Sequence, residues 1–298
     1  MDYKCSDCPR NCGALRGEKS AAGICASPAT SHVVRAAPHF GEEPCISGTK
    51  GSGAVFFSGC NLRCVFCQNR EISRSASGKE LNSSQLRELF LRLRDTGVHN
   101  INLVTPSHYI REIAKALDGL EIGIPVVWNS SGYDKVESLK MLEGLVQIYM
   151  PDLKYLKVDP AKRYSAAPDY PTVASAAIKE MYRQVGPYKM DDNGILESGL
   201  LIRHLILPQQ ELNTMDVIDF VSEEFPKGSV LFSLMSQYTP MPALEKFPEL
   251  QKTVDDETSS NLRSYMLKMG IEDGYWQDGA SATDEMIPAF DFTGLEDL

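Results

Sequence analysis

The sequence predicts an α/β protein with a partial (β/α)6 barrel of parallel strands, preceded by a cysteine-rich N-terminal leader. Six apolar segments of strand length alternate with amphipathic helical segments along most of the chain. Such units place their strands parallel and their helices on one side, through right-handed crossovers. Cysteines, not a glycine-rich dinucleotide fingerprint, follow the first strand, which favours a barrel over a doubly wound open sheet.

The first unit sets the pattern for the others. Residues 54–57 are expected to form a buried strand that ends at Ser58-Gly59. Residues 84–96 carry apolar side chains at helical spacing, with Ser83 or Ser84 as the N-cap and Gly97 as the stop. Further strands are expected at residues 101–104, 124–128, 146–150, 200–207 and 230–234, and further helices around residues 110–117, 136–142, 172–184, 215–225 and 259–268.

The Pro- and Gly-bearing run at residues 38–53 predicts the domain boundary. We therefore expect a metal-binding leader over residues 1–50 and a barrel over residues 51–298. The aromatic and polar residues of 274–279 are expected to cap the core or to close the barrel mouth against water.

Charge and hydropathy limit the classes of partner. The 298 residues include 30 Lys and Arg against 40 Asp and Glu, and the net charge of −10 argues against nucleic acid. The N-terminus has no apolar signal region, and the apolar run at residues 200–207 is interrupted by Arg203 and His204. We therefore expect a cytoplasmic protein that does not bind a membrane.

The eight cysteines all lie between Cys5 and Cys67. A disulfide framework would require an oxidising compartment and would staple the whole fold, so metal ligation by reduced thiols is the better interpretation.

Cys60, Cys64 and Cys67 follow the first strand at C-x3-C-x2-C spacing, and no cysteine comes after them. A 4Fe–4S cluster held by three thiolates leaves one iron open to an exogenous ligand, which implies chemistry. The alternatives are a four-cysteine zinc site that uses Cys45 and a ferredoxin-like electron carrier.

This loop, with Phe66 before the last cysteine, resembles the signature of the radical S-adenosylmethionine (SAM) superfamily. The resemblance implies that the open iron binds SAM and that the reduced cluster cleaves it to methionine and a 5′-deoxyadenosyl radical. It also implies a reducing partner such as a flavodoxin or a ferredoxin.

A closer resemblance, to proteins like the activating enzyme of pyruvate formate-lyase, runs from CPRNCG at residues 8–13 to IPAFD at residues 287–291. It implies oxidoreductase chemistry in which a glycine Cα hydrogen is abstracted from a partner glycyl-radical enzyme. The alternative substrates are another peptide or a small molecule.

The resemblance also implies residues that bind SAM. In place of the family's Gly-Gly-Glu-like turn, the second strand is followed by Thr105 and Ser107, which could accept hydrogen bonds or cap a helix. Asn129 and Ser131 lie in a turn similar to the family's Asp-Thr-Asn-Gly. Because Asn129 replaces the aspartate, it brings no negative charge to the family's monovalent-cation site.

Asp152 and Lys154 are similar to the family's Asp-Leu-Lys and share one face of an extended segment. Lys154 is expected to meet the SAM carboxylate and Asp152 to orient it, with a rim salt bridge as the alternative. Arg203 and His204 point to opposite faces of an apolar strand. A buried Arg203 must be paired, and the SAM carboxylate is a candidate partner, whereas His204 is expected to be an ordinary core histidine.

The leader holds four more cysteines, Cys5, Cys8, Cys12 and Cys25, in a segment with little apolar content. Metal binding would offset the entropy of ordering it. An auxiliary 4Fe–4S cluster is slightly favoured over structural zinc, unligated thiols are the remaining alternative, and Cys45 is expected to be a plain thiol.

Overall fold

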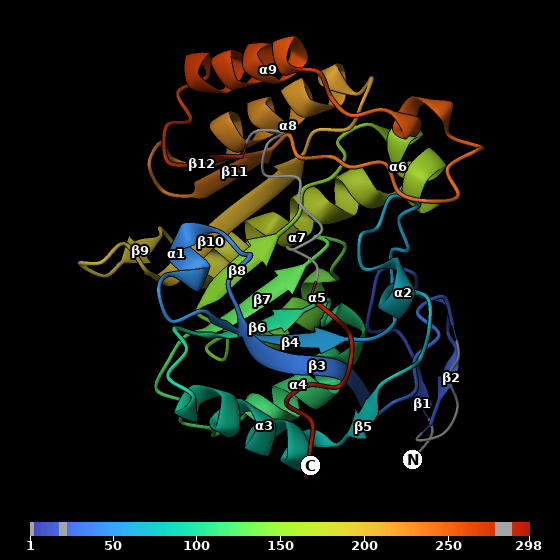
Figure 1. Cartoon of the computed structure of the whole chain (residues 1–298), viewed down its shortest axis with the longest axis vertical. Coiled ribbons are helices and arrows are strands. Elements are labelled where there is room, and N and C mark those ends of the chain that lie inside the picture. The colour runs from blue at the N-terminus through green and yellow to red at the C-terminus, as the bar shows by residue number, and fades with distance from the viewer. Residues whose placement is uncertain (1–2, 18–22, 278–287) are drawn as a thin grey trace.

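A sheet of ten strands runs through the computed structural model, which describes residues 3–17, 23–277 and 288–298 (Figure 1). Its parallel strands are β4 (Ser52–Phe57), β6 (Ile101–Val104), β7 (Val126–Ser130), β8 (Ile148–Pro151), β10 (Leu196–Leu205), β11 (Leu231–Met235) and β12 (Gly274–Gln277). Three antiparallel strands complete it: β3 (Ser31–His39), β5 (Lys79–Leu81) and β9 (Lys189–Met190). A separate hairpin pairs β1 (Tyr3–Lys4) with β2 (Leu15–Arg16).

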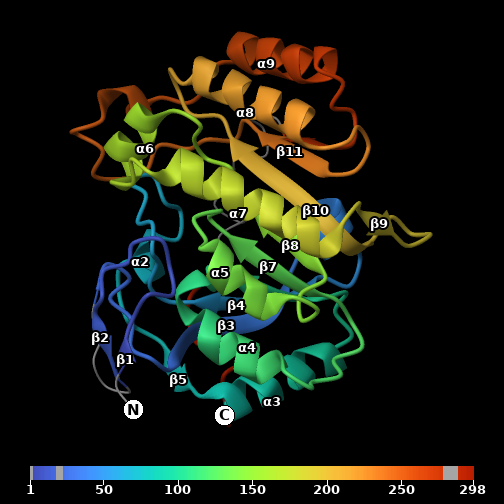
Figure 2. The ribbon, with the colours of Figure 1, turned by 180° about the vertical axis from the view of Figure 1, so that it is seen from behind.

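Most helices lie in the connections between strands. The α-helices are α1 (Pro44–Ser47), α2 (Arg70–Ser73), α3 (Ser83–Asp95), α4 (Ile110–Leu117), α5 (Val136–Leu139), α6 (Val158–Ser165), α7 (Tyr170–Val185), α8 (Glu211–Glu224) and α9 (Asp256–Lys268). Short 3₁₀ turns occur at η1 (Ser107–Tyr109), η2 (Lys140–Leu142) and η3 (Pro248–Gln251). Seen from behind, α4, α5 and α7 cover one face of the sheet (Figure 2).

The order of the strands distinguishes a doubly wound sheet from a sheet that winds in one direction. From β4 to β12, each parallel strand pairs with the next parallel strand along the chain, with no reversal of direction across the sheet. A doubly wound sheet would reverse at a switch point, whereas a barrel winds in one direction. The mixed α/β class with a largely parallel sheet is therefore confirmed. Strand pairing in the described residues leaves β5 and β12 as open edges, with seven parallel strands in place of the predicted six.

Several element boundaries differ from those predicted. The third parallel strand begins at Val126 because Pro125 has no N–H to give to a ladder. The N-cap of α3 is Asn82, not Ser83 or Ser84: its side chain accepts from the N–H of Ser84 and Gln85, and Gln85 completes a capping box. Residues 274–277 form the edge strand β12, and the rest of the predicted cap, residues 278 and 279, lies outside the described residues.

Each central strand is apolar on both faces, as a covered parallel sheet requires. On one face Trp128, Tyr149 and Ile202 join the main core under the helices. The alternate residues, including Ile148 and Leu201, form a second core on the inner face. The short helix α1 covers this inner core with Cys45 and Ile46, so the open part of the inner face is at the C-terminal ends of the strands.

The sheet also includes residues from the predicted leader. β3 pairs with β4 along most of its length, so the sheet begins before the boundary suggested at residue 50. Beyond the end of β5, the C-terminal tail contacts β3: the N–H of Ala36 donates to Thr293 O, and the N–H of Phe292 donates to Val34 O. Leu295 is buried against the main core.

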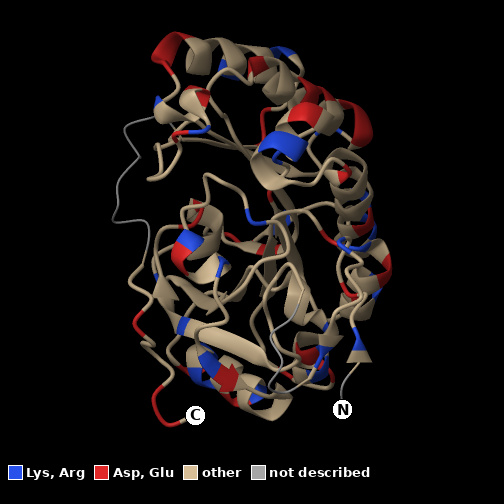
Figure 3. Ribbon diagram, turned by 90° about the vertical axis from the view of Figure 1, so that its right-hand side faces the viewer, with Lys and Arg blue, Asp and Glu red and all other residues tan. Residues whose placement is uncertain are grey.

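Acidic and basic residues are interspersed along the outer helices (Figure 3). Among the described residues, no helix is both long enough and apolar enough to span a bilayer.

Candidate active site

The loop that carries Cys60, Cys64 and Cys67 begins where β4 ends. Gly59 turns the chain there with a φ of +80°, which glycine adopts without strain. Further hydrogen bonds hold the loop: the Asn61 side chain donates to Tyr133 O at 2.8 Å, and the N–H of Val65 donates to Tyr164 O at 2.9 Å. Cys60 and Cys64 are buried, and Cys67 is half-buried.

A cavity of about 400 Å³ opens beside this loop, at the C-terminal ends of the parallel strands. Its volume falls within the range of roughly 300–1,000 Å³ that is typical of small-ligand sites. With the exception of Ser107, the residues predicted to lie at the barrel-end site line it: Cys60, Cys64, Phe66, Cys67, Thr105, Asn129, Ser131, Asp152, Lys154 and Arg203. These residues come from the ends of five strands, and the fold brings them together around one cavity, as their positions in the sequence predicted.

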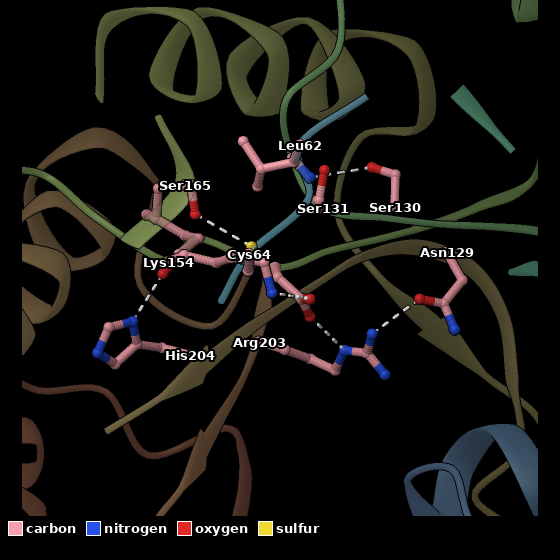
Figure 4. A network of polar contacts seen from close by, with 12 residues as sticks. Leu62, Cys64, Asn129, Ser130, Ser131, Lys154, Ser165, Arg203 and His204 are labelled. Carbon is pink, nitrogen blue, oxygen red and sulfur yellow. Dashed lines mark hydrogen bonds and ion pairs between the residues drawn. The ribbon is translucent and has the colours of Figure 1, made fainter. Parts of the chain in front are cut away.

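Arg203 is the centre of the polar network in this cavity (Figure 4). Its Nε donates to Asp152 at 3.0 Å, its Nη2 to Asn129 Oδ1 at 2.7 Å and its Nη1 to Glu42 at 2.9 Å. Lys154 donates to the other oxygen of Asp152 at 2.7 Å. Arg203 is therefore paired, as predicted, by the carboxylates of Asp152 and Glu42, and its contact with the SAM carboxylate stays a prediction.

Charge pairing also sets the ionisation of the network. Burial would raise the pKa of Asp152, but Lys154 and Arg203 outweigh it and hold that pKa below its ordinary value. Burial would likewise lower the pKa of Lys154, yet the neighbouring Asp152 carboxylate raises it. Lys154 is therefore a fixed cation that faces the cavity beside the cysteine loop.

The other face of β10 carries His204, which behaves as predicted. Its ring nitrogens lie 2.6 Å from Leu153 O and 3.0 Å from the hydroxyl of Thr214 on α8. Burial lowers the pKa of His204 to about 4, so it is a neutral core histidine.

Thr105 has a strained backbone at the cavity wall. Its φ of +60° lies in the left-handed region, which β-branched residues rarely adopt. The cost is about 1–3 kcal/mol, and such strain is typical of binding sites. The N–H of Thr105 is bonded to Asn129 O at 2.9 Å, so the turn is tied to the neighbouring strand end. Ser107 lies outside the cavity, in the turn η1.

Glu42 and Glu43 line the cavity and were not predicted. Glu42 accepts from Asn129, Asn102 and Arg203. Glu43 is 2% exposed, one of its oxygens has no hydrogen-bond partner, and burial raises its pKa. The sequence signal that could have identified them is a pair of consecutive acidic residues. This pair lies within residues 38–53, which were interpreted as a domain boundary.

The leader cysteines come together at a second place. Cys5, Cys8, Cys12 and Cys25 line a pocket of about 10 Å³ together with Asp7, Arg16 and His108. The N–H donors of Arg16 reach Pro28 O and His108 O, and Nη1 lies 3.8 Å from Cys5 Sγ. His108 is 1% exposed, and its Nδ1 has no hydrogen-bond partner.

The arrangement of the leader cysteines and of the loop cysteines indicates which kind of metal centre each set could bind. Among the described residues, no three Cys, His, Asp or Glu side chains are grouped closely enough to hold a single ion. A zinc ion draws all its ligands to within about 2.0–2.3 Å of one point, whereas a cubane cluster binds each thiolate to a different iron. The cavity-side thiols, three in one loop beside a cavity, fit a cluster with an open iron. Cys45 is buried in the inner core and is not at this cavity.

Comparisons with known proteins agree with this geometry. Residues 47–149 match the family model of the 4Fe-4S single cluster domain. The fold is similar to that of SuiB from Streptococcus suis, with a TM-score of 0.52, 15% identity and coverage of 77% of this chain and 50% of SuiB. It is also similar to a radical SAM methyltransferase from Sphaerobacter thermophilus, with a TM-score of 0.51, 14% identity and coverage of 75% and 65%.

The chain has the radical SAM fold. The predicted resemblance to the radical SAM superfamily is confirmed at this level, and the family match over residues 47–149 supports a 4Fe–4S cluster. In sequence, the chain is 29% identical over 229 residues to the uncharacterized protein MJ0674 of Methanocaldococcus jannaschii, over 74% of this chain and 62% of that protein. The chain thus spans about three-fifths of this relative and half of SuiB.

Proposed function

We propose that this protein is a radical SAM enzyme in which Cys60, Cys64 and Cys67 hold a 4Fe–4S cluster. The observation that carries the proposal is the opening of three thiols from one loop onto a cavity that also presents Lys154 and the Arg203 network. When bound and reduced by one electron, the cluster would break the C5′–S bond of SAM, releasing methionine and a 5′-deoxyadenosyl radical.

The residues of the chain have distinct proposed roles. Lys154 offers its ammonium group to the SAM carboxylate, and Asp152 holds it in place. Asn129, Ser131 and Thr105 supply polar groups on the adjacent strand ends. Arg203 keeps Asp152 and Asn129 oriented, and Phe66 packs beside the loop against Tyr164 and Tyr238. Ser165 donates to Cys64 Sγ at 3.1 Å, a contact that would tune the potential of a cluster bound by Cys64.

The competing function from another class is that of an iron–sulfur electron carrier. A carrier has no need of a cavity of ligand size beside its cluster. The test is production of 5′-deoxyadenosine by the reconstituted, anaerobically reduced protein. We expect product from the wild type and from Cys45→Ala, and none from Cys64→Ala. A wild type that holds its cluster but makes no 5′-deoxyadenosine would be a carrier.

For the substrate, we propose a glycine Cα of a partner glycyl-radical enzyme, on the basis of the sequence resemblance. A second candidate, modification of another peptide, is favoured by the similarity of fold to SuiB bound to its precursor peptide SuiA, with a TM-score of 0.53 and 16% identity. A small-molecule substrate is the remaining alternative.

Two experiments separate these substrates. Incubation with SAM and the organism's glycyl-radical enzymes, followed by electron paramagnetic resonance (EPR), should give a glycyl radical. If it does not, deuterium appearing in 5′-deoxyadenosine from labelled peptides or from labelled metabolites identifies the substrate class.

The proposal includes a second metal centre at Cys5, Cys8, Cys12 and Cys25, as a cluster or zinc, and a flavodoxin or ferredoxin as reductant. Reduced thiols at both sites agree with a cytoplasmic location.

A further inference from the structure

The side chain of Arg10, in the leader, is hydrogen-bonded to the backbone of the cysteine loop. Its Nε donates to Asn61 O at 2.8 Å, and its Nη2 donates to Leu62 O at 3.1 Å. Both carbonyls lie between Cys60 and Cys64. The same guanidinium donates to Ser165 O and Ala166 O at the end of α6. One side chain thus joins the cysteine loop to the segment whose Ser165 hydroxyl contacts Cys64.

The leader also packs against the start of the loop. A Cβ on Gly59 would lie 2.7 Å from Cys25 O and 2.2 Å from the Ser27 hydroxyl. The leader backbone therefore fills the space beside the residue that precedes Cys60. Figure 2 shows the leader on the same side of the molecule as α2, which follows the cysteine loop.

Arg10 itself lies between two of the leader thiols, Cys8 and Cys12. The turn that carries it is closed by a backbone hydrogen bond from the N–H of Asn11 to Cys8 O at 3.1 Å, and Asn11 has a φ of +41°. The hairpin beneath it has only two residues in each strand. So small a framework depends on a cross-link for its shape, and four thiols at one pocket provide the ligands.

We infer that metal bound by the leader thiols holds Arg10 in place, and that Arg10 positions the cysteine loop for its own cluster. This inference rests on the proposed function, because it assumes a cluster at Cys60, Cys64 and Cys67. Arg10 lines the leader pocket and not the 400 Å³ cavity, so it is a positioning residue that does not touch SAM.

The first test compares Arg10→Met with Arg10→Lys and with Arg87→Met. Arg87 is a matched control: it also joins carbonyls of another segment, Ala116 O, Asp118 O and Gly119 O, and it lines neither the leader pocket nor the cavity. The measurements are the rate at which a chelator removes iron from the SAM-responsive cluster and the EPR shift of that cluster on adding SAM.

Loss of charge-assisted hydrogen bonds to the loop should speed iron release by about tenfold in Arg10→Met. It should also broaden or weaken the SAM-induced EPR shift. Arg10→Lys, which keeps the charge but loses the fork, should fall between Arg10→Met and wild type, and Arg87→Met should match wild type. Unchanged iron release and EPR shift in Arg10→Met would overturn the inference.

The second test removes the leader ligands by changing Cys5 and Cys8 to Ser, alone and together with Arg10→Met. Zinc, iron and sulfide are counted in each protein; either zinc or additional iron with sulfide in the wild type supports the centre. If the leader metal acts on the cysteine loop through Arg10, the combined variant should release iron more slowly than the sum of the two separate effects would predict. Additive effects on iron release, or a wild-type leader that contains no metal, would overturn the inference.

These readouts do not depend on the proposed reaction. A wild type that holds both centres but makes no 5′-deoxyadenosine would contradict the proposed function. The dependence of iron release on Arg10 would still test whether Arg10 positions the cysteine loop.

Discussion

Arg203 shows how a buried charge is stabilised before any ligand arrives. Glu42, Asp152 and Asn129 take all three directions of its guanidinium, and Glu42 comes from a segment 161 residues away in sequence. The strand pattern predicted that Arg203 would be buried and paired. It did not predict the partner, because a contact between residues so distant in sequence depends on how the whole sheet is folded.

The first prediction concerns Lys154. Lys154→Met removes a cation that lines the cavity beside the cysteine loop and should weaken SAM binding by about 1.5–3 kcal/mol, the typical value of a charge-assisted hydrogen bond. The measurement is the SAM dissociation constant of cluster-loaded protein.

Lys157→Met is the control, because Lys157 forms a half-exposed ion pair with Asp216 outside the cavity. An unchanged SAM affinity in Lys154→Met, with fold and cluster intact, would assign Lys154 to structural support alone.

At the scale of the element, the turns that follow the strands and helices carry the site. α6 ends at Ala166, whose φ of +47° and ψ of +39° are left-handed. Ala166 is exposed, and its carbonyl accepts from Arg10, so the conformation is fixed by backbone contacts and not by its methyl group. A left-handed residue other than glycine costs roughly 1–2 kcal/mol.

Ala166→Gly should therefore raise the free energy of unfolding by about 1 kcal/mol. The measurement is denaturant unfolding of the cluster-loaded protein. The matched change Ala114→Gly, inside α4, should lower the same quantity by about 1 kcal/mol. A decrease in both variants would show that the backbone at Ala166 carries no strain that glycine relieves.

The elements with strong periodicity were predicted and those without it were not. The helix α3 and the six strands from β4 to β11 follow from apolar spacing, to within a few residues at their ends. β3 was missed because Pro38 lies inside it and lowers its strand signal, although Pro38 pairs opposite Gly53 in the antiparallel edge. The short helix α1 was missed because four residues carry no helical period.

At the scale of the molecule, the sequence predicted which strand ends would line one cavity, whereas it did not predict the antiparallel strands at the edge of the sheet. Ligand-type residues stand directly after strands in the sequence, and the C-terminal ends of parallel strands meet at one edge. Glu42 and Glu43 were missed because they follow β3, a strand that belongs to the sheet but not to the repeating units.

If the cavity binds SAM on a cluster, SAM should stabilise the whole protein. At a concentration of 100 times its dissociation constant, it should add about 2.7 kcal/mol to the free energy of unfolding. Anaerobic thermal unfolding measures this as a rise in Tm. Cys64→Ala, which cannot hold the cluster, should show a much smaller rise, and equal rises in both proteins would mean that SAM binds without the iron.

The C-terminal tail that contacts β3 has a consequence for anyone who shortens or extends this chain. Gly294 approaches β3 so closely that a Cβ there would lie 1.8 Å from Ala36 O. The tail thereby covers backbone groups of β3 that β5 is too short to reach. A chain cut before residue 290 would leave those N–H and C=O groups open, and an open strand edge is a template for pairing with another copy. We expect such a truncated protein to self-associate, whereas a tag placed after Leu298 leaves the covered edge intact.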